Sequence, residues 1–92
     1  MDVEFYCRSE KALFSSVGDD IVALHVDNGR CYGMENVTAA VWNVLAEPTD
    51  IPGICNRLCE LYDVEPALCR ADVERLISQF RGEGLVKAVP SE

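Results

Sequence analysis

The side chains with the widest chemical range in this sequence are five cysteines and a single histidine. Cys7, Cys31, Cys55, Cys59 and Cys69 form an odd set with no C-x-x-C pair, which is typical of free thiols in a reducing cytoplasm. Cys55 and Cys59 would share one helix face, but no further ligands follow at the spacing of a zinc site. We therefore expect these two cysteines to pack against a neighbouring helix as small apolar side chains, with no metal bound.

His25 is the only histidine that could act as a general base, and it lies in the apolar run at residues 22–26. Catalysis by an imidazole needs a nucleophile or an orienting carboxylate, and no such motif surrounds it. The glycines form no GxxxxGK or GxGxxG phosphate cradle, and the aspartates lack the ligand pattern of a calcium loop. The sequence therefore predicts a surface or edge-strand histidine, no catalytic residues and no cofactor.

Composition and charge exclude several classes of protein. The 92 residues, 49% hydrophobic and 26% charged, fit one small globular domain over residues 1–92. A formal net charge of −8 repels phosphate and argues against a protein that binds the nucleic-acid backbone. The apolar runs are far shorter than the roughly 20 residues of a membrane helix, and the first residues do not resemble a signal peptide. We therefore expect a cytoplasmic protein.

The elements that must position any site change character near residue 35, where the apolar period shifts from two to about 3.6. Before this point, residues 5–7, 12–14 and 21–26 predict strands. Residues 27–30, with the sequence Asp-Asn-Gly-Arg, tolerate the left-handed conformation of a tight turn. Strand 21–26 should therefore pair antiparallel with residues 31–34.

Helices are predicted after residue 35. Asn36 is the expected N-cap of the first helix, because its side chain can accept a hydrogen bond from an unpaired backbone N–H. Thr49 or Asp50 should cap the second helix, with Pro52 in its first turn, where the missing N–H costs nothing. The third helix should run from residue 67 to about residue 81. Residues 85–89 should then either pair as a wing or pack across the helices.

An exposed strand edge is the remaining candidate for a site. Strand 31–34 is short and lies beside the strand-to-helix junction, so its free N–H and C=O groups could pair with an extended peptide. Apolar positions of the third helix could supply pockets for the peptide's side chains: Val73, Leu76, Ile77 and Phe80. The same four residues could instead be plain core, and some could serve both purposes.

The sequence resembles PqqD-like domains. The resemblance is carried by DIVAL at residues 20–24, NGRCYGMENVTAAVW at residues 28–42 and DVERLISQFRGEGLV at residues 72–86. It spans residues 12–89 as a pattern of residue classes. The sequence departs from the family pattern at Met34, where members usually have Leu, and at Glu35, just before Asn36.

PqqD-like domains are the precursor-peptide recognition elements of ribosomal peptide natural-product (RiPP) pathways, and they are not enzymes. The resemblance implies an α+β, winged-helix-like fold in which a three-stranded antiparallel sheet is followed by three helices. It also implies that the leader segment of a precursor adds to the third strand and lies against the third helix. The peptide-binding residues expected on this basis are Arg30, Cys31, Tyr32, Gly33, Met34, Glu35, Cys69, Asp72, Val73, Leu76, Ile77 and Phe80.

Trp42 and residues 62–64 look most like the standalone leader-binding proteins of lasso-peptide pathways. In those pathways a separate cysteine protease removes the leader and a cyclase closes the ring, so the resemblance implies an adaptor that presents the leader to the protease. Acidic side chains near the expected groove would favour a leader with basic residues: Glu35, Asp72 and Glu74.

Two other functions stay open. A winged-helix nucleic-acid-binding or transcription-related module would place the third helix in the major groove, although the charges of that helix are mixed. An enzyme subunit would instead use the cysteine and histidine side chains.

Overall fold

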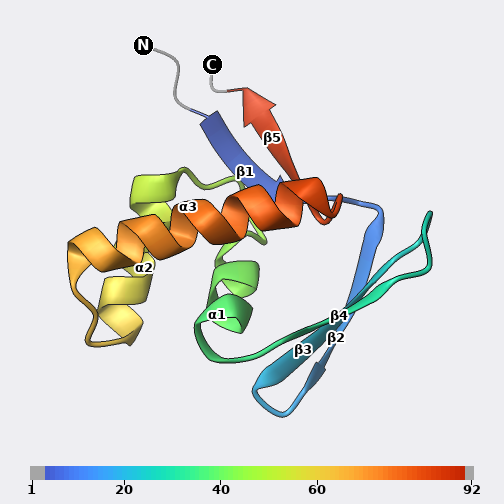
Figure 1. The fold of residues 1–92 in the computed structure, drawn as a ribbon, viewed down its shortest axis with the longest axis horizontal. Coiled ribbons are helices and arrows are strands. Elements are labelled where there is room, and N and C mark those ends of the chain that lie inside the picture. Colours follow the sequence, from blue (N-terminus) through green and yellow to red (C-terminus); the bar gives the residue numbers. More distant parts are fainter. Residues whose placement is uncertain (1–3, 91–92) are drawn as a thin grey trace.

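Two antiparallel sheets and three helices make up the fold, and the computed structural model describes residues 4–90 (Figure 1). The elements in chain order are β1 (Glu4–Arg8), β2 (Ala12–Val17), β3 (Asp20–His25), β4 (Cys31–Met34), α1 (Asn36–Val44), α2 (Ile51–Leu61), α3 (Pro66–Gly82) and β5 (Val86–Pro90). The predicted α+β class, with a three-stranded antiparallel sheet followed by three helices, is confirmed. Within the described residues, no helix is both long and apolar enough to cross a membrane.

The β3–β4 hairpin forms as predicted. Ile21 pairs with Met34 and Leu24 pairs with Cys31, so the two strands run antiparallel. In the connecting turn Gly29 has a φ of 70°, a left-handed conformation that glycine adopts without steric cost. β2 pairs with the other side of β3, which gives the sheet the order β2-β3-β4 and leaves β4 at one edge.

A second sheet joins the two ends of the described chain. The predicted strand at residues 5–7 lies in β1, outside the three-stranded sheet, and pairs antiparallel with β5. The last apolar segment therefore pairs with the N-terminal strand instead of packing across the helices. Tyr6 also exchanges two backbone hydrogen bonds of 2.9 Å with Thr49. These bonds connect the two-stranded β1–β5 ribbon to the segment before α2.

The helix starts agree with the sequence at α2 and disagree at α1. The Asp50 carboxylate accepts a hydrogen bond of 2.8 Å from the Gly53 N–H, and Pro52 lies in the first turn, as expected. The predicted N-cap role of Asn36 is wrong, because the residue before the helix is Glu35 and Asn36 is already its first residue. The chain bends sharply between β4 and α1, which places Asn36 at a φ of 51°.

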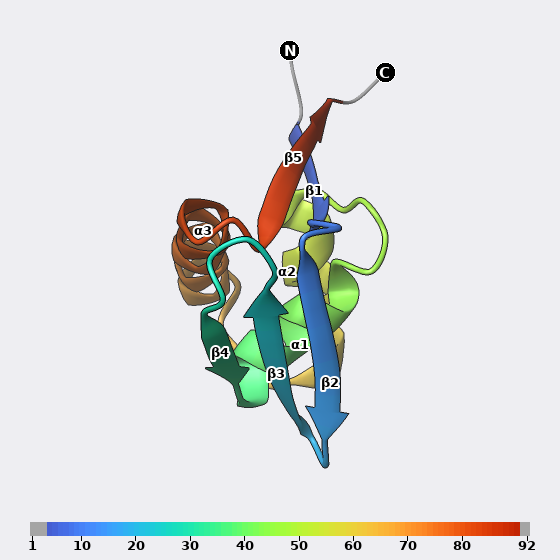
Figure 2. The ribbon, with the colours of Figure 1, turned by 90° about the vertical axis from the view of Figure 1, so that its right-hand side faces the viewer.

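The helices pack on one face of the β2-β3-β4 sheet, and Figure 2 shows the opposite face uncovered. Trp42 of α1 is fully buried at the centre of the core. Its ring makes edge-to-face contacts with Phe14 of β2 and Phe80 of α3, at centroid distances of 5.6 Å and 5.9 Å. The sheet, α1 and α3 therefore meet at one aromatic cluster.

Three thiols gather between α2 and α3. Cys69 is buried, and the Cys55 and Cys59 thiols on α2 lie close enough to influence its pKa. Cys55 is half-buried, as the packing interpretation requires, whereas Cys59 is exposed. All five cysteines are free, and among residues 4–90 no group of three or more Cys, His, Asp or Glu side chains is arranged to hold a metal ion. Burial raises the pKa of Cys69 to about 11.

The loop from α3 to β5 passes close to His25. Gly84 has a φ of 75°, and a Cβ added to it would lie 2.8 Å from the His25 Nε2 atom. His25 is half-buried and accepts a hydrogen bond of 3.2 Å at Nδ1 from the Asp27 N–H. The imidazole thus packs on the backbone of this loop, at the edge of the sheet.

The rate at which each cysteine is alkylated should decrease as its side chain becomes more buried. At pH 8 a thiol with a pKa of about 11 is ionised in only about one molecule in a thousand, so Cys69 should react with iodoacetamide last. The exposed Cys31 and Cys59 should react first, as measured by mass spectrometry of peptides after timed labelling. Labelling in urea provides the control, since all five cysteines should then react alike; equal rates for Cys69 and Cys31 in the folded protein would contradict the prediction.

The substitution Gly84→Ala should lower the free energy of unfolding by about 2 kcal/mol, because alanine is strained at this positive φ and its Cβ would displace His25. Gly82→Ala is the matched control, since no atom lies within 4 Å of an added Cβ there and alanine favours helix. Urea unfolding of both variants measures the difference. Equal stability of the two variants would show that the Gly84 backbone imposes no constraint.

Candidate functional site: a groove between strand β4 and helix α3

The outer edge of β4 carries backbone groups that point away from the sheet. His25 donates its N–H to the Arg30 carbonyl over 3.0 Å, so these two residues form a hydrogen-bonded pair. Hydrogen-bonded and non-hydrogen-bonded pairs alternate along an antiparallel ladder, so Tyr32 and Met34 direct their backbone groups toward β3. Cys31 and Gly33 therefore direct their N–H and C=O groups toward the open side.

A groove of about 390 Å³ lies between this edge and α3. Its walls combine all four residues of β4 with positions of α1 and α3: Cys31, Tyr32, Gly33, Met34, Thr38, Leu76, Gln79, Phe80 and Glu83. Met34 and Phe80 are almost fully buried and form the floor, while Tyr32 and Leu76 are half-buried on the walls. The structure therefore brings the expected strand edge and the expected helix together.

Only two of the four apolar α3 positions reach this groove. Leu76 and Phe80 line it, whereas Val73 is fully buried in the core. Ile77 is also buried, and it borders a separate hollow on the other side of α3, next to Tyr6. At about 100° per residue, Val73 lies only about 20° from Phe80 around the helix and points into the core beneath the groove, whereas Ile77 lies about 100° from Leu76. Val73 and Ile77 therefore do not line the groove surface, and their part in peptide binding stays a prediction.

A second hollow continues along α3 toward its N-terminus. It has a volume of about 320 Å³ and is mostly apolar, with Val37, Leu58, Tyr62, Val64, Leu68 and Cys69 among its lining residues. Asp63, Glu65 and Asp72 add carboxylates to the lining. Val37 adjoins Thr38 on α1, and Asp72 lies one helical turn before Leu76, so the second hollow follows the first. Cys69 and Asp72, both expected at the site, belong to this second hollow.

The acidic residues divide between the groove and other surfaces. Glu35 is exposed directly after Met34, and Asp72 is exposed and paired with Arg75 over 3.0 Å. Glu74 lies away from the groove: it pairs with Arg70 over 3.2 Å and borders the hollow on the other side of α3. Glu83, which the sequence reasoning did not select, is half-buried in the groove wall. Its spacing of seven residues from Leu76 is the signal that could have identified it.

Arg30 lies in the hairpin turn and is not part of the groove lining. Its N–H bonds the Asn28 side chain over 2.8 Å and its carbonyl accepts from His25, so both backbone groups serve the turn. The side chain is exposed. Of the expected strand residues, the groove therefore contains Cys31, Tyr32, Gly33 and Met34.

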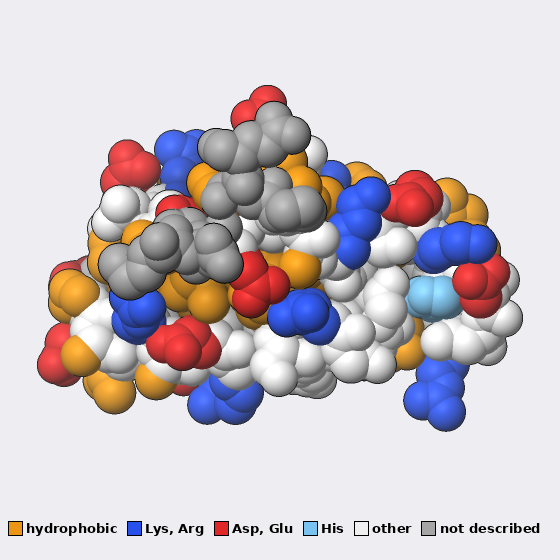
Figure 3. All heavy atoms as spheres, turned by 90° about the horizontal axis from the view of Figure 1, so that it is seen from above, with side chains coloured by type: hydrophobic (Ala, Val, Ile, Leu, Met, Phe, Trp, Pro, Cys, Tyr) orange, Lys and Arg blue, Asp and Glu red, His pale blue; other side chains and the backbone are white. Residues whose placement is uncertain are grey.

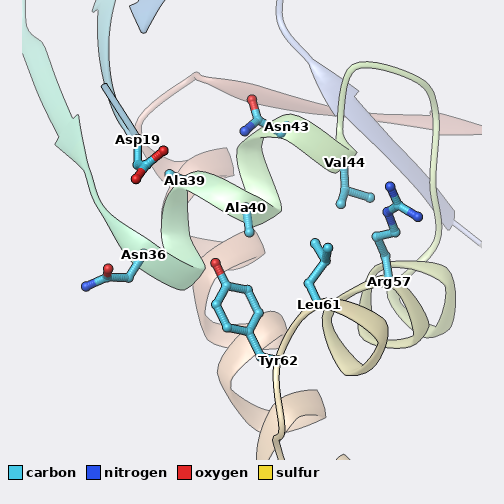
Figure 4. Close-up of a pocket in the computed structure, with 9 residues that line it drawn as sticks. All are labelled: Asp19, Asn36, Ala39, Ala40, Asn43, Val44, Arg57, Leu61 and Tyr62. Atoms are coloured by element: carbon cyan, nitrogen blue, oxygen red, sulfur yellow. The ribbon is translucent and has the colours of Figure 1, made fainter. Parts of the chain in front are cut away.

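Sequence reasoning also missed a polar cleft of about 430 Å³ between α1 and α2 (Figure 4). Asp19, Asn36, Asn43, Arg57 and Tyr62 supply its polar side chains. Figure 4 shows the Tyr62 ring extending toward α1, between Asn36 and Leu61. Tyr62 also lines the second hollow, so it separates that apolar hollow from this polar cleft.

The surface charges are intermixed. On α3, Arg70 pairs with Glu74 and Arg75 pairs with Asp72, and both pairs are exposed. The face seen in Figure 3 likewise shows acidic and basic side chains next to one another. Such pairing lowers the positive potential that a phosphate backbone would require, which disfavours the nucleic-acid alternative.

Comparison with known proteins supports the fold and the family. TbiB1 in complex with the TbiA(beta) leader peptide has 21% sequence identity and a TM-score of 0.83; the match covers 88% of this chain and 94% of that one. Lasso peptide synthetase B1 complexed with the leader peptide has 15% identity and a TM-score of 0.78; that match covers 89% and 96% of the two chains. The comparison with curated proteins finds no match.

The family model described as coenzyme PQQ synthesis protein D (PqqD) matches residues 20–86. The matched segment begins with β3, includes β4 and all three helices, and ends at the start of β5. It therefore contains both walls of the groove and most of the chain. On this evidence the chain belongs to the PqqD family.

Proposed function

We propose that this protein is a non-catalytic adaptor that binds the leader segment of a ribosomally made precursor peptide as an additional strand on β4. The observation that carries the proposal is the open edge of β4, which faces α3 across a groove. Two solved structures with the same fold contain a leader peptide, which supports this class of ligand.

Main-chain pairing would supply affinity for the leader, and the groove would supply specificity for its side chains. Cys31 and Gly33 each offer an N–H and a C=O to an added strand, and these groups fit any sequence. Side chains of an added strand alternate between its two faces. Those on the groove side would contact Tyr32, Leu76 and the Phe80 ring. Thr38, Gln79 and Glu83 add polar groups to the same walls.

The second hollow would bind part of the leader beyond the paired strand. It follows the groove along α3, and its lining combines Leu58, Val64 and Leu68 with the carboxylates of Asp63, Glu65 and Asp72. An apolar side chain with a basic residue nearby fits this combination of surfaces. In this proposal Cys69 and Asp72 are peptide-binding residues, although they lie outside the groove at β4.

An adaptor of this kind would act through local concentration. A leader held on β4 keeps the rest of its precursor close to any enzyme that binds the adaptor, and effective concentrations for short flexible linkers reach about the millimolar range. We propose the leader-removing cysteine protease as the main partner, with a cyclase as a further maturation enzyme, and we place the function in the cytoplasm.

Gly33→Pro should weaken leader binding about tenfold or more. The proline removes an N–H that points to the open edge, whereas the bonds from β4 to β3 come from Tyr32 and Met34. Fluorescence polarisation with labelled candidate leader peptides measures the affinity. Gly33→Ala is the matched control, because it keeps the N–H and its Cβ would meet no atom within 4 Å.

The Gly33 comparison is interpretable only when the fold is intact, which circular dichroism and thermal unfolding would establish. A folded Gly33→Pro variant that binds the leader as tightly as the Gly33→Ala variant would rule out strand addition at this edge.

Leader affinity should fall by about twofold to fivefold between 50 and 500 mM NaCl, because salt screens exposed carboxylates but leaves strand pairing and apolar contacts in place. The double substitution Glu35→Gln and Glu83→Gln should remove much of this salt dependence, since these carboxylates lie closest to β4 and in the groove. Glu47→Gln, in the exposed segment before α2, is the control. A leader affinity that is independent of salt would show that these carboxylates do not contribute to recognition.

A further inference from the structure

The three-stranded sheet has a second open edge, formed by β2 on the side opposite β4 (Figure 2). Val26 donates its N–H to the Lys11 carbonyl over 2.9 Å, so Lys11 directs its backbone toward β3. Backbone direction alternates along a strand, so the odd-numbered residues of β2 also bond β3. Phe14 and Ser16 therefore direct their N–H and C=O groups away from the sheet. Among residues 4–90, no backbone hydrogen bond to another element uses these groups.

Strand β2 has none of the features that ordinarily protect a sheet edge. Natural edge strands carry charges, prolines or bulges that prevent pairing with another chain. The six residues of β2 are Ala-Leu-Phe-Ser-Ser-Val, and their pairing with β3 is unbroken from Ala12 to Val17. Leu13, Phe14 and Val17 are 58%, 44% and 63% exposed. An uncharged, apolar edge of this kind is a template for pairing with another strand.

The sequence of β2 is complementary to a second copy of itself in one antiparallel register. With Ser15 opposite Ser15 of the second copy, Phe14 lies opposite Ser16 of that copy, and the two residues can exchange two main-chain hydrogen bonds. The two-fold axis repeats this pair. The same register sets Leu13 opposite Val17 of the second copy, so apolar side chains meet on the face of the sheet away from the helices. The neighbouring registers that keep the hydrogen bonds set Leu13 or Val17 opposite Ser15 instead.

We propose that β2 is a homodimer interface, at which two copies of this chain pair edge to edge and join their three-stranded sheets into one. None of the hollows described above includes a residue of β2, so a foreign peptide would gain main-chain bonds there without pockets for its side chains. A second copy supplies matched side chains as well. The paired strands carry no charge, and repulsion between copies of net charge −8 is screened beyond about 8 Å at physiological salt.

Dimerisation through β2 would leave the other edge of each sheet free. In the joined sheet the two β4 strands form the outer margins, so both grooves beside α3 stay open. The inference is independent of the proposed function, because the β2 edge is open whether or not a leader occupies β4. If β4 does bind a leader, the dimer would hold two leaders at opposite margins of one sheet.

Analytical ultracentrifugation of the full chain, from about 5 to about 500 µM, should show the mass rising from one chain toward two, because one pair of strands makes a small interface and a weak dimer. Ser16→Pro removes an N–H that would bond the second copy, and it should raise the dimer dissociation constant about tenfold or more. Ser16→Ala keeps this N–H and is the matched control. Circular dichroism and thermal unfolding would establish that both variants fold.

A charge pair tests the register. Leu13→Asp and Val17→Lys should each weaken the dimer about tenfold, because each sets a charge against an apolar side chain of the second copy. The double variant should return to within about threefold of the wild-type dissociation constant, since opposite charges then face each other across the axis. Its recovery also excludes misfolding as the cause of the single effects. Val22→Lys, on the same face but on the central strand β3, should leave the dimer intact.

A chain that stays monomeric at every concentration would overturn the proposal. A dimer that Ser16→Pro and both single charge variants leave intact would do the same. Loss of the dimer in Val22→Lys alone would assign the contact to two sheets stacked face to face. Weaker binding of candidate leader peptides by the folded Ser16→Pro variant than by Ser16→Ala would assign β2 to the leader, and either result would overturn the homodimer interface.

Discussion

The packing of Trp42 is the interaction on which the arrangement of this protein depends. Its fully buried ring meets Phe14 of the sheet and Phe80 of α3 edge to face, and each such aromatic pair contributes about 0.5–1.5 kcal/mol beyond the area it buries. Arg8 covers the cluster: its guanidinium lies 4.4 Å from the Phe14 ring centre and donates a hydrogen bond of 2.9 Å to the Trp42 carbonyl. Strand β1, the three-stranded sheet, α1 and α3 are therefore positioned by one set of contacts.

The shape of the groove depends on the aromatic cluster around Trp42. Phe80 is both a partner of Trp42 and part of the groove floor, and Met34 is both a sheet core residue and the other part of that floor. Substitution of either residue would disturb the core together with the site. Leu76 and Glu83 are less buried and can change with little effect on the interior. Selectivity among peptides can therefore evolve through the walls of the groove while its floor stays fixed.

Local patterns in the sequence were sufficient to predict the β3–β4 hairpin, the Asp50 cap and the helical face around Leu76 and Phe80. The pairing of β1 with β5 could not be predicted in the same way, because it joins Glu4 to Pro90 and neither segment carries a local signal for its partner. The left-handed Asn36 depends on the angle between β4 and α1, which only tertiary packing determines. The positions of Val73, Ile77 and Glu74 were missed for a related reason: periodicity gives a helical stripe but not the orientation of that stripe toward the sheet.

The β1–β5 ribbon also controls where the chain can be joined to other proteins. Glu4 pairs with Pro90, and Figure 1 shows these ends of β1 and β5 side by side, on the side opposite the turn between β2 and β3. A fluorescent tag or an enzyme domain attached at either end would extend from this shared exit point and would leave the edge of β4 open. A longer polypeptide that contained this domain would therefore enter and leave it at neighbouring positions, away from the β2–β3 turn.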